Sequence, residues 1–302
     1  MKVLQINNID LPGRRFNGHD LQERLNQLGI ECKNMVFDKI GSNVNTIEFA
    51  NERDKYLRTL YWKLEEKFSM QSLLFPFGWK ILNHHDFKNS DIVHYHLIHN
   101  MFMSLYSFLE MTKQKPAVWS IHDIWAFTGH CIINKECDKW KYGCEGCPYK
   151  GMLFPMKEDK ANQMWKIKKK IYDQMDVDIV VASDYMKKMV SESPLIGNKR
   201  IHKISFGVDL NKFKPQDIHQ CKRNLGIPQD HFVISFRAIE NGAKGTEYIR
   251  KMLEMLKPSK PIRPNDSATD GIKKRSVAPY ISTILASSCT HPTSMILYLF
   301  LN

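Results

Sequence analysis

The sequence predicts an α/β protein whose first 195 residues form one doubly wound parallel sheet with helices on its faces. Two observations predict this class. Apolar runs of strand length recur along this part of the chain, and segments with helical spacing of apolar residues separate them. Such alternation is typical of parallel sheets covered by helices. The 302 residues are enough for two domains at about 150 residues each.

The first strand is expected at residues 2–6, and a helix over 20–28 follows because Leu21, Leu25 and Leu28 recur at helical spacing. Further strands are expected at 31–37, 91–96, 117–121 and 178–182. Residues 46–87 have no clear assignment, since aromatic and charged residues alternate there without a period and the segment FPFGW breaks any single long helix.

A second α/β unit is expected to begin at residue 196, in a segment that runs to residue 256. Its elements are a strand at 200–205, a helix at 217–225, a strand at 231–236 and a helix at 246–256. From 257 to 302 the chain is rich in Pro, Ser and Thr without a sustained period, which indicates an irregular tail, disordered or non-native. A doubly wound half usually takes well over about 100 residues, so this second unit is expected to be incomplete.

The composition limits the kinds of molecule that the protein is expected to bind. The formal charge is +12, from 44 basic and 32 acidic side chains, which favours nucleic acid, an anionic membrane surface or phosphate groups of a substrate. No recognition helix, zinc-finger spacing or aromatic RNA-binding motif accompanies the basic residues, so nucleic acid is not expected. The first residues do not read as a signal peptide, and no apolar stretch approaches the roughly 20 residues of a membrane span. A cytoplasmic protein is therefore expected.

Three polar groups lie where expected strands meet loops, which is where open α/β sheets bind ligands. They are the loop 10–18 with Gly13 and Arg14, the pair His122 and Asp123, and the pair Arg237 and Lys244. Glycines let backbone amides approach a phosphate, a polar pair can hold a ligand hydroxyl, and fixed cations stabilise an anionic leaving group. An ordinary turn, a structural histidine and solvated surface charge are the respective alternatives.

Four cysteines are closely spaced in the insert 131–148. Cys131, Cys137, Cys144 and Cys147 are separated by five, six and two residues, and the last pair forms the segment CEGC. This pattern is consistent with a structural zinc site, with reduced buried thiols or with disulfides. Seven cysteines in a chain without an export signal argue against a disulfide framework. His94, His96 and His99 also lie close in sequence, but i, i+2 spacing places only the first two on one strand face, so a metal site is not expected there.

Residues 120–148, SIHDIWAFTGHCIINKECDKWKYGCEGCP, join a strand, a His-Asp corner and this cysteine insert. The segment resembles the retaining glycosyltransferases of family 4, in the colanic-acid-type branch that builds bacterial surface polysaccharides. Further matches are LPGRRFNG at 11–18, GVD at 207–209, Arg237 and Lys244 with Gly245. Together they span residues 1–256.

The resemblance implies a GT-B fold of two Rossmann-like domains and the transfer of a sugar, with retention, from a nucleotide sugar to a saccharide or lipid-linked acceptor. It implies no cofactor for the chemistry. His122 would lie beside the transferred sugar as a positioning residue, and Arg237 and Lys244 would hold the donor diphosphate. Gly13, Arg14 and Asp123 would line the donor side of the cleft. A lipid-linked acceptor and the basic charge imply peripheral contact with the inner face of the membrane.

The family's pair of glutamates eight positions apart is absent, since Glu240 and Glu247 are seven apart. A truncation or a reading-frame change near residue 257 would explain this and the incomplete second domain, and a divergent donor half is the alternative. A truncated chain could be inactive. Two rival functions follow from these features: a non-catalytic acceptor-binding or scaffolding domain, and a zinc-dependent nucleic-acid-binding module.

Overall fold

The computed structural model describes residues 1–10, 19–133, 136–150, 154, 156–211, 213–230, 232–238, 245–255 and 295–301. The chain divides into two compact units, Met1–Gly207 and Val208–Asn302. Gly13, Arg14 and Lys244 lie outside the described residues.

The first unit contains a seven-stranded sheet of order β3-β2-β1-β4-β5-β6-β7 in which every neighbouring pair is parallel. The strands are β1 (Lys2–Ile9), β2 (Glu31–Asp38), β3 (Thr46–Glu48), β4 (Ile92–Tyr95), β5 (Ala117–Ser120), β6 (Asp178–Val181) and β7 (Ile201–Lys203). The order reverses between β1 and β4, as in dinucleotide-binding sheets. The predicted doubly wound fold is therefore confirmed for this unit.

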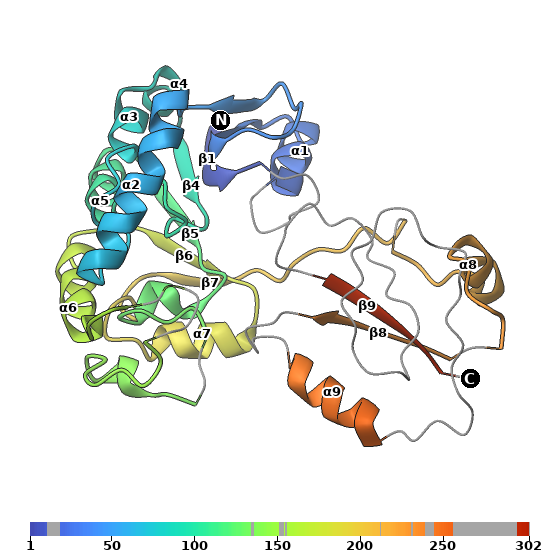
Figure 1. The fold of residues 1–302 in the computed structure, drawn as a ribbon. Coiled ribbons are helices and arrows are strands. Elements are labelled where there is room, and N and C mark those ends of the chain that lie inside the picture. Colours follow the sequence, from blue (N-terminus) through green and yellow to red (C-terminus); the bar gives the residue numbers. More distant parts are fainter. Residues whose placement is uncertain are drawn as a thin grey trace. The chain divides into compact units, whose positions relative to one another are not determined.

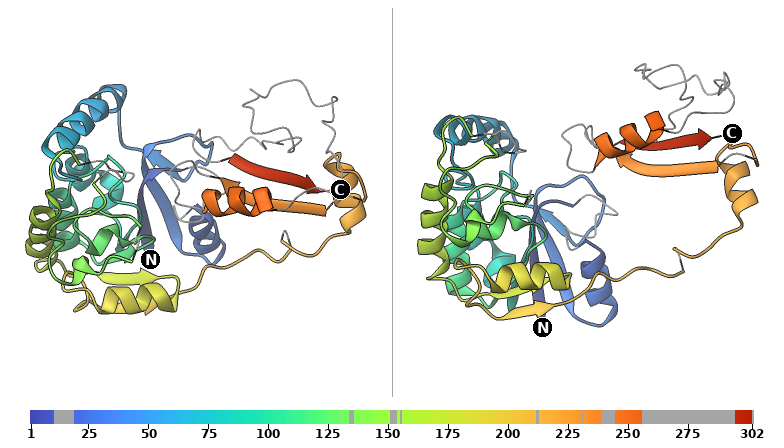
Figure 2. Two further views of the ribbon diagram at one scale, coloured as in Figure 1. Left: turned by 60° about the horizontal axis from the view of Figure 1, so that its bottom comes forward. Right: turned by 90° about the horizontal axis from the view of Figure 1, so that it is seen from below.

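Helices cover both faces of the sheet. They are α1 (His19–Gln27), α2 (Glu52–Phe68), α3 (Gly78–Asn83), α4 (His85–Lys88), α5 (Leu105–Gln114), α6 (Ala161–Tyr172) and α7 (Asp184–Ser191). α1 lies on one side of the sheet, and α2, α3, α5 and α6 lie on the other (Figures 1 and 2). Because both faces are covered, side chains on both faces of the central strands are buried: Leu4, Ile6, Val93 and Tyr95 are at most 1% exposed, and so are the polar Gln5 and Asn7 of β1.

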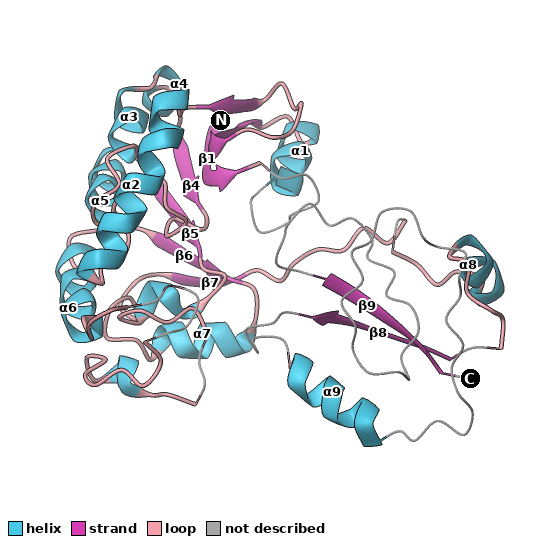
Figure 3. Ribbon diagram, viewed as in Figure 1, coloured by secondary structure: helices cyan, strands magenta, loops and turns pink. Residues whose placement is uncertain are grey.

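Residues 46–87, left unassigned from the sequence, form β3, α2, α3 and α4 (Figure 3). α2 begins with a capping box: the Asn51 side chain accepts from the backbone N–H of Asp54, and the Asp54 carboxylate accepts from the backbone N–H of Asn51. Its amino end is therefore defined by local hydrogen bonds as well as by packing.

β7 corrects the domain boundary expected at residue 195. The strand pairs with β6, so it extends the seven-stranded sheet and belongs to the first unit, which ends at Gly207.

The second unit contains α8 (Ile218–Asn224), β8 (Phe232–Ala238), α9 (Thr246–Met255) and β9 (Met295–Leu301). β8 and β9 pair antiparallel. Met295–Leu301 is thus an exception to the irregular tail expected over 257–302, and the rest of that tail lies outside the described residues. An incomplete second Rossmann-like domain stays a prediction. None of the described helices is long and apolar enough to cross a membrane.

Candidate functional site: a His-Asp corner at the end of the sheet

A polar corner lies where β4 and β5 end side by side. His94 and Val118 are paired across these strands, so the residues that follow each strand emerge at the same edge of the sheet. A hollow in this corner is lined by His96, His122, Asp123 and other residues. Two of the predicted site residues, His122 and Asp123, therefore line this hollow. Its position at the carboxyl ends of the strands is where ligands generally bind in such sheets.

The histidines form a chain of contacts. His96 Nε2 lies 3.0 Å from Gln5 Oε1, and His96 Nδ1 lies 3.5 Å from His122 Nε2. The Nε2 amide group of Gln5 donates a hydrogen bond to Cys32 Sγ at 3.3 Å, so its Oε1 is left to accept a hydrogen bond from His96 Nε2–H. His96 Nδ1 is then an acceptor for His122 Nε2–H. The two rings are nearly parallel, with 3° between their planes.

His94 packs beside this chain, with its ring centroid 4.2 Å from that of His96. Its Nε2 lies 2.8 Å from Ser120 Oγ. Burial, followed by the charge of His122, lowers the pKa of His94 to about 4. His94 is therefore neutral near pH 7 and adds no positive charge to the corner.

Asp123 fixes the turn that follows β5. It caps a short 3₁₀ helix, Ile124–Phe127, by accepting from the backbone N–H of Trp125 at 2.9 Å. Its carboxylate lies 3.2 Å from His99 Nε2. Burial raises the pKa of Asp123, but the opposing charge and hydrogen bond of His99 outweigh burial and leave the pKa lowered. Asp123 is therefore an ionised, internally bonded carboxylate whose position is set by His99 and the backbone.

Trp125 anchors the same turn beneath the corner. Its indole N–H donates to Gln71 Oε1 at 2.7 Å, and its ring stacks on His99 with centroids 4.8 Å apart. Both contacts join segments far apart in the sequence, so the sheet and the loops around it fix the turn.

Lys168 on α6 is a member of this site that the sequence analysis missed. The side chain is fully buried, and its Nζ donates to the carbonyl oxygens of Trp125 at 2.6 Å and of Thr128 at 2.9 Å. Nζ also lies 3.5 Å from the centroid of the Trp125 ring. Burial lowers the pKa of Lys168 to about 7, against the attraction of Cys144, Asp123 and Cys131. The one signal in the sequence is its position four residues after Met164 on the apolar face of the helix.

The cysteine insert packs against the same turn. The described cysteines, all six of them, are free, so the disulfide alternative has no support among these residues. Cys144 accepts from the backbone N–H of Gly129 at 3.2 Å. A hydrogen bond from Cys131 lowers the pKa of Cys147 to about 6, whereas burial raises the pKa of Cys144 to about 11.

A zinc site at these cysteines stays a prediction. In the part of the chain that the structure describes, no three His, Cys, Asp or Glu side chains form a group that could hold a metal ion. The thiols are a suitable donor set by chemistry alone, but their positions do not provide coordination geometry.

The remaining predicted site residues belong to other segments. Gly13 and Arg14 follow β1, and Lys244 precedes α9, in segments outside the described residues. Arg237 lies in β8, opposite Ile296 of β9, and only its backbone is described. Their roles in donor binding therefore stay predictions.

Comparison with known proteins decides the family. The model of Glycosyltransferase Family 4 matches residues 20–212, which include the whole His-Asp corner and the cysteine insert. The chain belongs to glycosyltransferase family 4. It is also similar to the putative colanic acid biosynthesis glycosyl transferase WcaC of Escherichia coli (strain K12), with 35% identity over 175 residues. That match covers 54% of this chain and 42% of the relative, so the matched part of this family 4 chain spans less than half of the relative's length.

Proposed function

We propose that this family 4 protein transfers a sugar from a nucleotide-sugar donor to a saccharide or lipid-linked acceptor, with retention, in the synthesis of a cell-surface polysaccharide. The observation that carries the proposal is the His-Asp corner, which lies at the ligand-binding edge of a doubly wound sheet inside the segment that matches the family. The name of the similar E. coli protein supports polysaccharide synthesis as the setting.

In this proposal His122 positions the transferred sugar. The contact with His96 restrains its ring, and Asp123 is engaged by His99 and Trp125, so neither group is arranged as a mobile base. A rigid polar wall of this kind contributes by holding the sugar in a reactive orientation. Arg237 and Lys244 would supply the charge that stabilises the departing nucleoside diphosphate.

Titration of the full chain with nucleoside diphosphate sugars tests donor binding. Saturable binding is expected, and His122→Asn should weaken it, whereas His85→Asn on the exposed side of α4 should not. Incubation with a lipid-linked saccharide should then give a product whose anomeric configuration, measured by NMR, equals that of the donor.

A non-catalytic acceptor-binding domain is the second candidate. It is supported by the extent of the matches, because the family segment ends at residue 212 and the similar protein is covered over 42% of its length. Absence of saturable binding at millimolar donor, together with retained binding of the acceptor saccharide, would favour this candidate and contradict transfer.

A further inference from the structure

The chain returns to the His-Asp corner after it leaves the last strand of the sheet. β6 lies between β5 and β7, and the backbone N–H groups of Ile121 and Ile204 each donate, at 2.9 Å, to carbonyl oxygens at the end of β6. These two segments therefore flank the same strand end. His122 and Phe206, which follow them by one and two residues, emerge beside one another.

The ring of Phe206 lies against the imidazole of His122. The two ring centroids are 5.9 Å apart, with 23° between the planes, which is within the range of offset stacking. His96 is a second stacked neighbour, with its centroid 5.8 Å from that of His122. The imidazole thus has one polar and one apolar ring beside it.

These two neighbours restrain His122 in different ways. The contact between His96 Nδ1 and His122 Nε2 measures 3.5 Å, which is long for a hydrogen bond, so it restrains the ring only weakly on its own. A stacked phenyl ring opposes rotation of the imidazole plane, because rotation would lose the stacking contact. It contains no hydrogen-bonding group, so it fixes the orientation without occupying an imidazole nitrogen that a sugar hydroxyl could use.

Phe206 has little part in the hydrophobic core of the first unit. It is 48% exposed and lies just before the unit ends at Gly207, whereas Ile201 of β7 packs against the core. Substitutions of such exposed side chains usually change stability little. A change at Phe206 is therefore expected to affect His122 more than the fold.

We propose that Phe206 is a positioning residue, which holds the imidazole of His122 in the orientation that contacts the transferred sugar. The inference rests on the proposed sugar transfer and assigns that site a further residue. A site residue acts only in the fraction of molecules in which its ring has the productive orientation. Loss of a stacking contact changes such a population by roughly 2- to 10-fold.

NMR of the His122 ring protons tests the stacking in the free protein. The ring current of Phe206 displaces these resonances, which are assigned by their disappearance in His122→Asn. Phe206→Ala should move them toward the positions of an unstacked imidazole. Phe206→Tyr keeps an aromatic ring and should retain the displacement.

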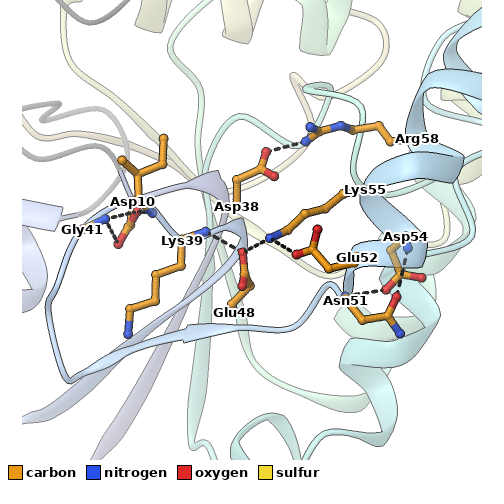
Figure 4. A network of polar contacts seen from close by, with 11 residues as sticks. Asp10, Asp38, Lys39, Gly41, Glu48, Asn51, Glu52, Asp54, Lys55 and Arg58 are labelled. Carbon is orange, nitrogen blue, oxygen red and sulfur yellow. Dashed lines mark hydrogen bonds and ion pairs between the residues drawn. The ribbon is translucent and has the colours of Figure 1, made fainter.

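Phe68→Ala is the matched control. Phe68 is 50% exposed and is the last residue of α2, a helix that ion pairs of Arg58 and Lys55 hold to β2 and β3 (Figure 4). The substitution removes an equally exposed phenyl ring, and the helix should keep its place. It should leave the resonances of His122 unchanged.

Transfer kinetics, with the donor and acceptor of the titration above, test the role in the reaction. Phe206→Ala should lower kcat/KM by roughly 2- to 10-fold, whereas Phe206→Tyr and Phe68→Ala should stay close to the unmodified protein. In a His122→Asn background, Phe206→Ala should have no further effect, because Phe206 acts through the imidazole.

The outcomes separate this role from the proposed function. Unshifted His122 resonances in Phe206→Ala would overturn the role, and so would equal losses of kcat/KM with and without His122. Absence of donor binding and transfer in the unmodified protein would contradict the proposed function and, with it, the role of Phe206. Far-UV circular dichroism of each variant confirms that the fold is retained.

Discussion

Replacement of Lys168 by Met tests whether the buried ammonium group holds the turn of the His-Asp corner. Lys168→Met keeps a long apolar stem but removes the donors to the carbonyl oxygens of Trp125 and Thr128. Each buried acceptor left without a donor costs about 1–3 kcal/mol, and the contact with the Trp125 ring adds about 1–2 kcal/mol in a desolvated setting. The substitution also removes the cost of burying a charged amine, which offsets part of this loss of stability. We expect a net loss of about 2–4 kcal/mol in the free energy of unfolding near pH 7.

The pH dependence of this loss makes the prediction specific. The pKa of Lys168 is about 7 in the folded protein, and an unfolded lysine has a pKa of about 10.4. Between these values the unfolded chain binds the proton and the folded chain does not, so the contribution of Lys168 to stability rises with pH. The slope is at most about 1.4 kcal/mol per pH unit, and the cost of Lys168→Met should therefore increase from pH 7 to pH 9.

Urea unfolding followed by tryptophan fluorescence measures this cost at several pH values. The difference between the two proteins cancels the titration of other groups that they share. Lys166→Met, on the exposed side of the same helix, is the control and should change stability by less than about 0.5 kcal/mol at every pH. If the cost of Lys168→Met stays constant or decreases with rising pH, the lowered pKa of the buried Lys168 is refuted.

Three further predictions concern the same region. A Cβ on Gly129 would lie 2.1 Å from the backbone oxygen of Ala161, so Gly129→Ala should lower the free energy of unfolding by about 1–3 kcal/mol in the same urea assay. Gly207→Ala is the control and should be nearly neutral, because its Cβ would meet nothing within 4 Å. Asp123→Asn keeps an acceptor for the helix cap but removes the charge of the carboxylate that contacts His99, and it should cost about 1–3 kcal/mol at pH 7. Because the pKa of Asp123 is lowered, this cost should decline as acid protonates the unmodified carboxylate, and a cost unchanged in acid would contradict the lowered pKa. At neutral pH iodoacetamide should alkylate Cys147 faster than Cys144, since their pKa values are about 6 and about 11. Peptide mass spectrometry measures both rates. If both thiols are equally protected from alkylation and a chelator removes this protection, the result would instead support the zinc prediction.

The sequence predicted five of the strands of the first unit, because buried parallel strands are largely continuous apolar runs, as in Asp178–Val181 and Ala117–Ser120. It did not reveal α2, whose inner side buries Asp54 and Glu65 and whose outer side exposes Tyr56, so that the hydrophobic period is weak. The capping box of Asn51 and Asp54 that defines its start is a finding of the structure. The partner of β7 was also misread, because a three-residue strand contains no local information about which sheet it joins.

The sequence identified some residues of the candidate site but not the contacts that join them. His122 and Asp123 were identified by their position after an apolar strand, whereas the contact of Asp123 with His99 depends on two neighbouring strands ending together. Lys168 was missed for a related reason. A lysine is normally solvated, and its burial follows from the two backbone carbonyls that the turn presents to it.

These contacts restrict what the corner can do chemically. His94 is neutral near pH 7 because of burial, and Asp123 is ionised but already engaged by His99 and a backbone N–H. The rings of His96 and His122 are stacked, with 3° between their planes, and the ring of His94 packs against His96 at a tilt of 38°. Such an arrangement favours hydrogen bonding to neutral hydroxyl groups over proton transfer, which is the property required by the proposed role of this corner in orienting a sugar.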